Sequence, residues 1–226
     1  ESLYAAEALL RIHDKNGNFI SPAEAIPILE ESGLIIPVGK WIIQNAFSMC
    51  TECRKYYPEF RVSINLSYVQ ILKSPLMMEL KQMIEHSGIS CSGIIVELTE
   101  SGYLEGTPAV RSVWNDMKQL RIQIALDDFG TGYSNLMNIS NLEPDIVKLD
   151  RGFTLKALSR SYEYQLMQYV IEMVHKLNQY VCVEGVETKE DLEKIKALGP
   201  DLIQGYYYSK PCSRDEFLKK FFGYSE

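Results

Sequence analysis

The stretch RIQIALDDFGTGYSN, residues 121–135, carries the signals that decide the fold. Residues 122–127 show the apolar pattern of a buried strand, which ends in two adjacent carboxylates, Asp127 and Asp128, followed by a loop containing two glycines. Two like charges side by side repel each other, so stability alone does not explain the pair. Polar residues directly after a buried strand indicate a site at the carboxyl edge of a parallel sheet.

Strands of this kind alternate with helical patterns along all 226 residues. This alternation predicts an α/β fold with a mostly parallel sheet, as either a β/α barrel or a doubly wound sheet. A Rossmann-type sheet needs a G-x-G-x-x-G turn after its first strand, and residues 9–11 offer none. Because the strand count is near eight, we expect a modified (β/α)8 barrel formed by one domain, residues 1–226. The predicted strands are residues 3–9, 60–66, 93–98, 122–127, 145–149, 180–183 and 202–208.

Three helices can be predicted from the sequence, two by their ends and one by its apolar spacing. The segment SPAEAIPILEESG predicts a helix with Ser21 as its N-cap, Glu24 completing a capping box and Gly33 as its stop. The segment TKEDLEKIKALG predicts a helix that begins at Thr188 and ends at Gly199. The segment SYEYQLMQYVIEMVHKLN is expected to bury an apolar stripe at helical spacing, namely Leu166, Val170, Val174 and Leu177.

Composition and charge restrict the classes of function. The net charge of −7 argues against binding to polymeric nucleic acid, which needs a basic surface, and a phosphate ester would require bound cations. There is no apolar run of about 20 residues and no signal-peptide pattern, so we expect no membrane span in this chain and a cytoplasmic location. The chain begins at Glu1 within a strand-like segment. We therefore expect a fragment of a longer protein with additional regulatory domains, in which a membrane anchor elsewhere is possible.

Five cysteines are present, and they are not spaced as a disulfide framework. Cys50 and Cys53 form a C-x-x-C inside the helical pattern WIIQNAFSMCTECRKYY, and no second Cys or His pair lies nearby. We interpret the pair as buried free thiols, with a zinc or redox site as the alternative.

Polar side chains stand at or just beyond the carboxyl end of nearly every predicted strand. In a barrel these ends meet at one rim, where active sites are built. Five carboxylates in so small a space repel one another strongly unless cations offset their charge. Oxygen ligands indicate Mg²⁺ or Mn²⁺ rather than zinc, and none of the three histidines is at a strand end. The residues concerned are Glu7, Asn65, Glu97, Asp127, Asp128, Lys148, Glu184 and Gln204.

Each of these residues also has a simpler explanation when taken alone. Asn65 is a candidate helix cap, and Glu7 a candidate ion-pair partner of Arg11. Lys148 is a candidate for a salt bridge with Asp150 or with a glutamate. Gly130-Thr131-Gly132 is a common turn composition, and Glu97 with Glu100 suits the start of a helix.

Taken together, the set suits hydrolysis of a phosphodiester with two metal ions. The adjacent pair Asp127-Asp128 suits such a site, because one of the two carboxylates can bridge the ions while the other serves only the second ion. Lys148 is placed to orient or deprotonate the attacking water, or to stabilise charge on the phosphate.

The motifs resemble those of the EAL domain family, the bacterial modules that hydrolyse cyclic-di-GMP to linear pGpG. The name derives from the Glu-Ala-Leu found here as Glu7-Ala8-Leu9. The resemblance runs from end to end and implies a modified β/α barrel, commonly a homodimer. The matching segments, in the family's order, are EALLR (7–11), INLS (64–67), VELTES (96–101), LDDFGTGYSN (126–135), VKLD (147–150), VEGVET (183–188) and QGYYYSKP (204–211).

The resemblance also implies roles for particular residues. It assigns water activation to Lys148, with Glu7 and Glu184 beside it in the catalytic set. The first ion is held by Glu7, Asn65, Glu97 and Asp127, and the second by Asp127, Asp128 and Glu184. Substrate contacts or support are assigned to Leu9, Arg11, Glu187 and Gln204. Coupling of the dimer to metal binding is assigned to Glu100 and to the loop of Phe129, Gly130, Thr131 and Gly132.

The chain departs from the family pattern at three places. Ile12 stands where a tryptophan is common, and Pro200 where a cysteine is common. The upstream part of the family's first strand, with its Gln-Pro, is missing. Two other functions stay open: a receptor or interaction module without turnover, and an unrelated Mg²⁺ barrel enzyme that uses Lys148 as a base or Schiff-base nucleophile.

Overall fold

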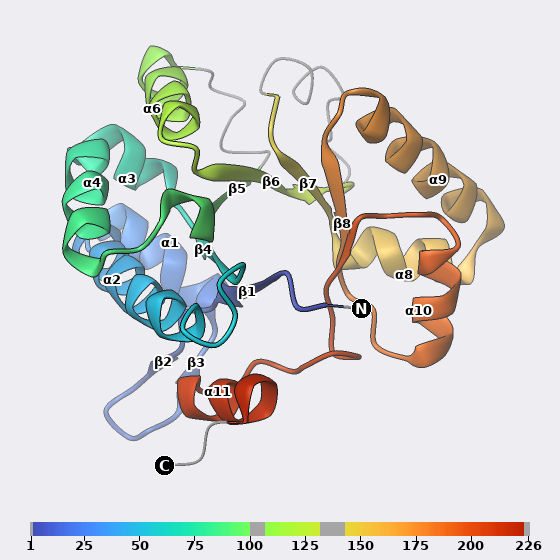
Figure 1. Ribbon diagram of the computed structural model, residues 1–226, viewed down its shortest axis with the longest axis horizontal. Helices are drawn as coiled ribbons and strands as arrows, with labels where there is room; N and C mark the ends of the chain where they lie inside the picture. Colours follow the sequence, from blue (N-terminus) through green and yellow to red (C-terminus); the bar gives the residue numbers. More distant parts are fainter. Residues whose placement is uncertain (1, 100–106, 132–142, 224–226) are drawn as a thin grey trace. The chain divides into compact units, whose positions relative to one another are not determined.

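The computed structural model in Figure 1 describes residues 2–99, 107–131 and 143–223. The chain divides into two compact units. The first comprises Glu1–Glu97, Glu105–Ile122 and Arg214–Glu226, and the second comprises Leu98–Leu104 and Gln123–Ser213. Each unit is a parallel β structure with helices, as the alternating sequence pattern predicts.

In the first unit the strand order is β1-β4-β5, and neighbouring strands are parallel. Residues 62 to 64 of β4 are almost completely buried, in agreement with the apolar run seen in the sequence. The register places Glu7 beside Ser63 and Asn65 beside Glu97. The carboxyl ends of these three strands therefore bring polar residues side by side. The strands are β1 (Ala5–Ala8), β4 (Arg61–Asn65) and β5 (Ile94–Thr99).

Helices cover this sheet, and α2 contacts β4 as well as its helical neighbours α1, α3 and α4 (Figure 1). Its buried face includes Ile43, Ala46 and Phe47. The helices of the unit are α1 (Pro22–Ser32), α2 (Ile35–Cys53), α3 (Tyr68–Lys73), α4 (Leu76–Ser87), the 3₁₀ turn η1 (Cys91–Gly93), α6 (Pro108–Gln119) and α11 (Arg214–Phe222).

A short hairpin in the first unit was not predicted. Strands β2 (Ile12–His13) and β3 (Phe19–Ile20) pair antiparallel, with Ile12 opposite Ile20. The turn is built by Asp14, whose carboxylate accepts hydrogen bonds from the backbone N–H groups of Asn16 at 2.7 Å and Asn18 at 2.9 Å. The segment Asp-Lys-Asn-Gly carries the turn signal, but the flanking strands are only two residues long. Ile12, at the family's tryptophan position, belongs to this hairpin.

In the second unit the strand order is β6-β7-β8-β9, again parallel. All four residues of β7 are buried, as expected for a central strand covered on both faces. The helices α8 and α9 pack against each other (Figure 1). The elements are β6 (Gln123–Phe129), β7 (Ile146–Leu149), α8 (Arg151–Ser159), α9 (Ser161–Lys176), β8 (Tyr180–Val183), α10 (Lys189–Lys196) and β9 (Leu202–Ile203).

All seven predicted strands are present, but the last is much shorter than predicted. β9 ends at Ile203, although the aromatic run to Tyr208 has strand-like composition. The chain turns at Gly205, where an added Cβ would lie 2.0 Å from the Val186 carbonyl oxygen. This close approach of two backbone segments replaces the expected continuation of the strand.

Helix ends follow the sequence signals with two exceptions, the capping box of α1 and the end of α10. Ser21 caps α1 but accepts from the Ala23 N–H, so the predicted capping box with Glu24 is wrong. Gly33 ends that helix with φ 76°, as predicted. Thr188 caps α10 in a complete capping box. That helix ends at Lys196 with Ala197 as its C-cap, not at the predicted Gly199, because Leu198 and Gly199 already form turn-type bonds to residues three positions back. None of the helices in the described part of the chain is long and apolar enough to cross a membrane.

The predicted buried face of α9 is only partly correct, because Val174 is buried as predicted but the other members of the predicted stripe are not. The buried residues are Met167, Ile171 and Val174, whereas Leu166 and Leu177 are each 42% exposed. Two apolar stripes overlap in this helix, and both have helical spacing. Packing against α8 and β8, which the sequence does not reveal, selects the stripe containing Met167.

Cys50 and Cys53 are fully buried in the last turn of α2, which ends at Cys53. The Cys50 Sγ lies 3.6 Å from the Gly93 carbonyl oxygen and 3.8 Å from that of Phe60. Burial raises the pKa of Cys50 to about 11 and that of Cys53 to about 12. Both thiols are therefore protonated at neutral pH, which supports the interpretation as buried free thiols over a zinc or redox site.

Candidate active site

The carboxyl ends of the strands in the first unit hold Glu7, Asn65 and Glu97. The Asn65 side-chain amide donates to Glu7 Oε1 at 2.7 Å, and so links β1 to β4. The Ser63 hydroxyl donates to Glu97 Oε1, and Glu97 is only 3% exposed. The structure thus brings Glu7 and Asn65 together as predicted, with Glu97 in register beside Asn65.

Ser63 was missed in the sequence, although a signal was available. In the β4 sequence RVSIN, Ser63 and Asn65 are two residues apart, so their side chains lie on the same face of the strand. Ser63 therefore lies in the same polar cluster as the Asn65 amide, and its position two residues before Asn65 is the signal that the sequence offered.

The alternative explanation of Asn65 as a helix cap is wrong. The N-cap of α3 is Ser67, whose hydroxyl accepts from the Val69 N–H at 3.1 Å. Gln70 completes a capping box by accepting from the Ser67 N–H at 3.1 Å. The Asn65 amide is therefore available for Glu7.

In the second unit, Lys148 joins two of the predicted carboxylates. Its Nζ lies 2.7 Å from Glu184 Oε1 and 3.1 Å from Asp127 Oδ1. Lys148 is 3% exposed, so its ammonium is almost fully removed from bulk water. The salt-bridge alternative is thus correct for a glutamate and wrong for Asp150. The carboxylate of Asp150 instead caps α8 by accepting from the Gly152 N–H at 2.7 Å.

One carboxylate oxygen of this cluster lacks a hydrogen bond. Asp127 Oδ1 is buried, and no described residue donates to it in hydrogen-bond geometry, although the Lys148 ammonium stands at ion-pair distance. A buried carboxylate oxygen is costly unless a donor or a cation satisfies it. This oxygen therefore has the capacity to accept a further donor or cation beside the Lys148 ammonium.

The two adjacent aspartates lie in a β-bulge of β6. Leu126 pairs with Val147 and Phe129 with Leu149, so β6 has one residue more than β7 over this interval. Asp128 adopts the left-handed conformation, with φ 60°, within this bulge. Bulges redirect side chains and are common beside active sites. Here Asp127 is half-buried next to Lys148, whereas Asp128 is exposed.

The predicted substrate residues of the first unit lie at the end of β1. Leu9 is 43% exposed, and the exposed Arg11 donates to the Leu10 carbonyl oxygen at 2.9 Å. The Arg11 guanidinium also stands 5.9 Å from the centre of the Phe19 ring. Both side chains are accessible to a ligand, and the predicted contacts with substrate stay predictions.

The predicted substrate residues of the second unit are Gln204 and Glu187. The Gln204 N–H donates to the Val183 carbonyl oxygen at 2.9 Å, which fixes Gln204 directly after β9. Glu187 forms an ion pair with Arg151, at 2.7 Å from its Nη2. Arg151 was missed in the sequence, because a single arginine at the start of a helix carries no distinctive signal.

The loop after β6 is described as far as Thr131. Phe129 is buried, and its carbonyl oxygen accepts from the Asp150 N–H at 3.0 Å. Gly130 has φ 104°, and an added Cβ would lie 2.7 Å from the Phe153 ring, so both conformation and packing require glycine there. Thr131 is exposed, while Glu100 and Gly132 lie outside the described residues. The predicted control of metal binding by this loop remains a prediction.

The residues present fit a hard divalent cation by their chemistry. The strand ends supply carboxylate and amide oxygens, and the Asp127 oxygen lacks a donor. In the described ranges, however, no group of three or more His, Cys, Asp or Glu side chains has a metal-binding arrangement. The number and identity of the ions therefore rest on the sequence.

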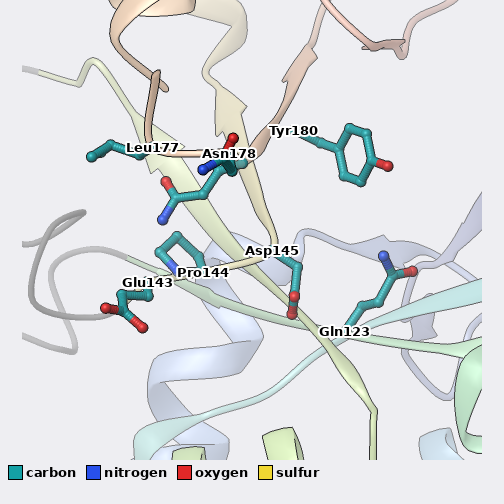
Figure 2. A pocket seen from close by; sticks show the side chains of 8 residues that line it. Gln123, Glu143, Pro144, Asp145, Leu177, Asn178 and Tyr180 are labelled. Atoms are coloured by element: carbon teal, nitrogen blue, oxygen red, sulfur yellow. The ribbon is translucent and has the colours of Figure 1, made fainter. Parts of the chain in front are cut away.

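A cavity in the second unit lies at the opposite ends of the strands. Its volume is about 460 Å³. Figure 2 shows the side chains around it, which come from the amino-terminal ends of β6, β7 and β8 and the segments before them. Gln123, Asp145 and Tyr180 mark those three ends. None of the residues predicted for the site lines it, so it does not belong to the candidate active site.

Comparisons with known proteins define the class. The EAL domain family model matches residues 1–211. The solved structure described as "Structure of EAL Enzyme Bd1971 - cAMP and cyclic-di-GMP bound form" is similar, with a TM-score of 0.91 and 30% identity, over 96% of this chain and 60% of that one. "PaMucR Phosphodiesterase, c-di-GMP complex" has a TM-score of 0.87 and 27% identity, over 94% and 86%. The predicted α/β barrel-type fold is confirmed.

The chain belongs to the EAL domain family. Among curated proteins of Escherichia coli (strain K12), it is 32% identical to "Cyclic di-GMP phosphodiesterase PdeF" and 33% identical to "Cyclic di-GMP phosphodiesterase PdeR", over 91% of this chain in both cases. The chain spans 27% and 31% of the lengths of these two relatives.

Proposed function

We propose that this chain is a metal-dependent phosphodiesterase that hydrolyses cyclic-di-GMP to linear pGpG. The observation that carries the proposal is the buried Lys148 between Asp127 and Glu184, because structural ion pairs are rarely so deeply buried. Two relatives named as cyclic di-GMP phosphodiesterases and two similar structures with bound cyclic-di-GMP support the substrate class.

The proposed cofactor is a pair of Mg²⁺ or Mn²⁺ ions. Such ions supply Lewis-acid activation of water and offset the charge of the phosphate. We assign the first to Glu7, Asn65, Glu97 and Asp127, and the second to Asp127, Asp128 and Glu184. The amide of Asn65 orients Glu7, and the hydroxyl of Ser63 orients Glu97.

Lys148 has the central role among the chain's own groups. Its ammonium holds Asp127 and Glu184 in place and offsets part of their charge. We assign to it the orientation of the attacking water and stabilisation of charge on the phosphate. Leu9, Arg11, Gln204 and Glu187 are assigned to substrate binding, and the exposed positions of Leu9 and Arg11 are compatible with that role.

Several accompanying proposals come from the same resemblance. We propose a homodimer, a single EAL domain over residues 1–226, further regulatory domains in the whole protein and a cytoplasmic location for this domain. We propose in addition that Glu100 and the loop from Phe129 to Gly132 couple the dimer to metal binding.

Chromatography tests the proposed activity. The chain is incubated with cyclic-di-GMP and Mg²⁺ or Mn²⁺, and the formation of pGpG is followed. We expect product with the unaltered chain and none with Glu7→Ala. Binding without product would identify a receptor instead of an enzyme, and full activity of Glu7→Ala would overturn the metal assignment.

A further inference from the structure

Arg151 begins α8 directly after β7 and faces Glu187 (Figure 1 shows both elements). Its Nη2 lies 2.7 Å and its Nε 3.2 Å from the same atom, Glu187 Oε1. Both donors engage the same oxygen, and among the described residues no hydrogen bond to the second oxygen of Glu187 is found. The carboxylate is thus held through one oxygen, in a side chain that is 37% exposed.

The local fold is arranged around this arginine. The Asp150 carboxylate caps α8 and fixes where the helix begins, which sets the position of Arg151. Gly185, with φ 77°, leaves room for its side chain, since a Cβ there would lie 2.3 Å from Arg151 Cγ. The pKa of Arg151 is raised, first through its hydrogen bond to Glu187. The sequence VEGVET thus supplies both the partner of Arg151 and the space that it occupies.

Stability does not account for this pair. The side chains of Arg151 and Glu187 are 56% and 37% exposed, and ion pairs this exposed to solvent contribute little to stability. The pair nevertheless follows the carboxyl ends of β7 and β8 in the sequence, and Lys148 and Glu184 lie at those same ends. Fixing the direction of one carboxylate at such a position matters more for ligand binding than for folding.

We infer that Arg151 is a positioning residue, which fixes Glu187 so that its second carboxylate oxygen meets the substrate. This role rests on the proposed phosphodiesterase function. Without Arg151, Glu187 samples several rotamers, and substrate binding must restrict them. We therefore expect KM to rise. The rate of the turnover step, in which Lys148 acts, should change little.

The test is steady-state hydrolysis of cyclic-di-GMP by the whole chain with Mg²⁺ or Mn²⁺. We expect Arg151→Ala to raise KM about tenfold with kcat within about twofold, and Arg151→Lys to recover part of the loss. Arg160→Ala is the matched control, because Arg160 also forms a solvent-exposed ion pair, with Glu163 at 3.1 Å, at the start of the next helix. It should change neither parameter.

A double-mutant cycle isolates the coupling. If Arg151 acts through Glu187, Arg151→Ala combined with Glu187→Ala will raise KM no more than Glu187→Ala alone. If the two substitutions raise KM additively, the inference is wrong. It is also wrong if Arg151→Ala leaves KM unchanged while the unaltered chain is active. In both cases the proposed function would stand. Absence of both binding and hydrolysis in the unaltered chain would overturn the proposed function and this inference with it.

Discussion

The two units hold their carboxylates in different ways. At the strand ends of the first unit, Glu7 and Glu97 accept hydrogen bonds from an amide and a hydroxyl of β4, which are neutral groups. In the second, Asp127 and Glu184 share the buried ammonium of Lys148. A neutral donor fixes the direction of a carboxylate without offsetting its charge, whereas an ammonium does both. The first arrangement depends on strand register and the second on one cation.

Removal of that cation should produce the largest effect. We expect Lys148→Met to lower the free energy of unfolding by about 3 kcal/mol, since it leaves two largely buried carboxylates without their partner. We also expect it to reduce hydrolysis at least about a hundredfold. Urea denaturation and pGpG formation measure the two effects.

Lys40→Met provides the matched control for stability. Lys40 pairs with Glu79 at 3.4 Å, but its side chain is 44% exposed, so the expected loss is below about 1 kcal/mol. Equal losses in the two variants would mean that burial of the Lys148 cluster has no energetic consequence.

In the first unit, Ser63→Ala should have an intermediate effect. It removes a neutral donor from the buried Glu97, and we expect a loss of about 1–2 kcal/mol in the free energy of unfolding. Ser90→Ala is the control, because the exposed Ser90 bonds only Ser92 among side chains, at 2.9 Å. If the two substitutions cost the same, the hydrogen bond to Glu97 does not support the strand ends.

Asp128→Gly should separate stability from function in the second unit. Glycine accepts φ 60° without strain, so we expect the fold to be retained while hydrolysis is lost. Asn178→Gly, at φ 59°, is the matched control and should leave hydrolysis unchanged. Retained activity in Asp128→Gly would remove Asp128 from the proposed metal ligands.

Thiol alkylation is the prediction with the smallest expected effect, because the folded chain should protect its buried cysteines. At pH 8 only about one Cys50 in a thousand is a thiolate, because its pKa is raised to about 11. Iodoacetamide should therefore modify the exposed Cys212 of the second unit and leave Cys50 and Cys53 of the first unmodified in the folded state. Mass spectrometry after brief labelling checks this, and rapid labelling of Cys50 would contradict the buried-thiol interpretation.

The strands were predictable because each combines an apolar interior with a polar carboxyl end, a local pattern. The hairpin around Asp14 was not, since two-residue strands have no periodicity to detect. The length of β9 depends on the close approach of Val186 to Gly205, which are distant in sequence. The buried face of α9 depends on tertiary packing against α8 and β8, which neighbour it in the chain but whose placement the local pattern does not give.

The residues of the candidate site likewise divide into those that could be predicted from the sequence and those that could not. Motif positions such as Glu7, Asn65 and Lys148 could be named from the sequence. The bulge at Asp128 could not, because it depends on the pairing of β6 with β7. Arg151 was missed for a related reason: only the fold brings it to Glu187, which is 36 residues away in sequence.

The most direct test of the central claim is the formation of pGpG from cyclic-di-GMP by the unaltered chain, with Mg²⁺ or Mn²⁺ and then with excess EDTA. We predict product in the presence of either ion and none after chelation. Tight binding of cyclic-di-GMP with no pGpG under any of these conditions would contradict the account.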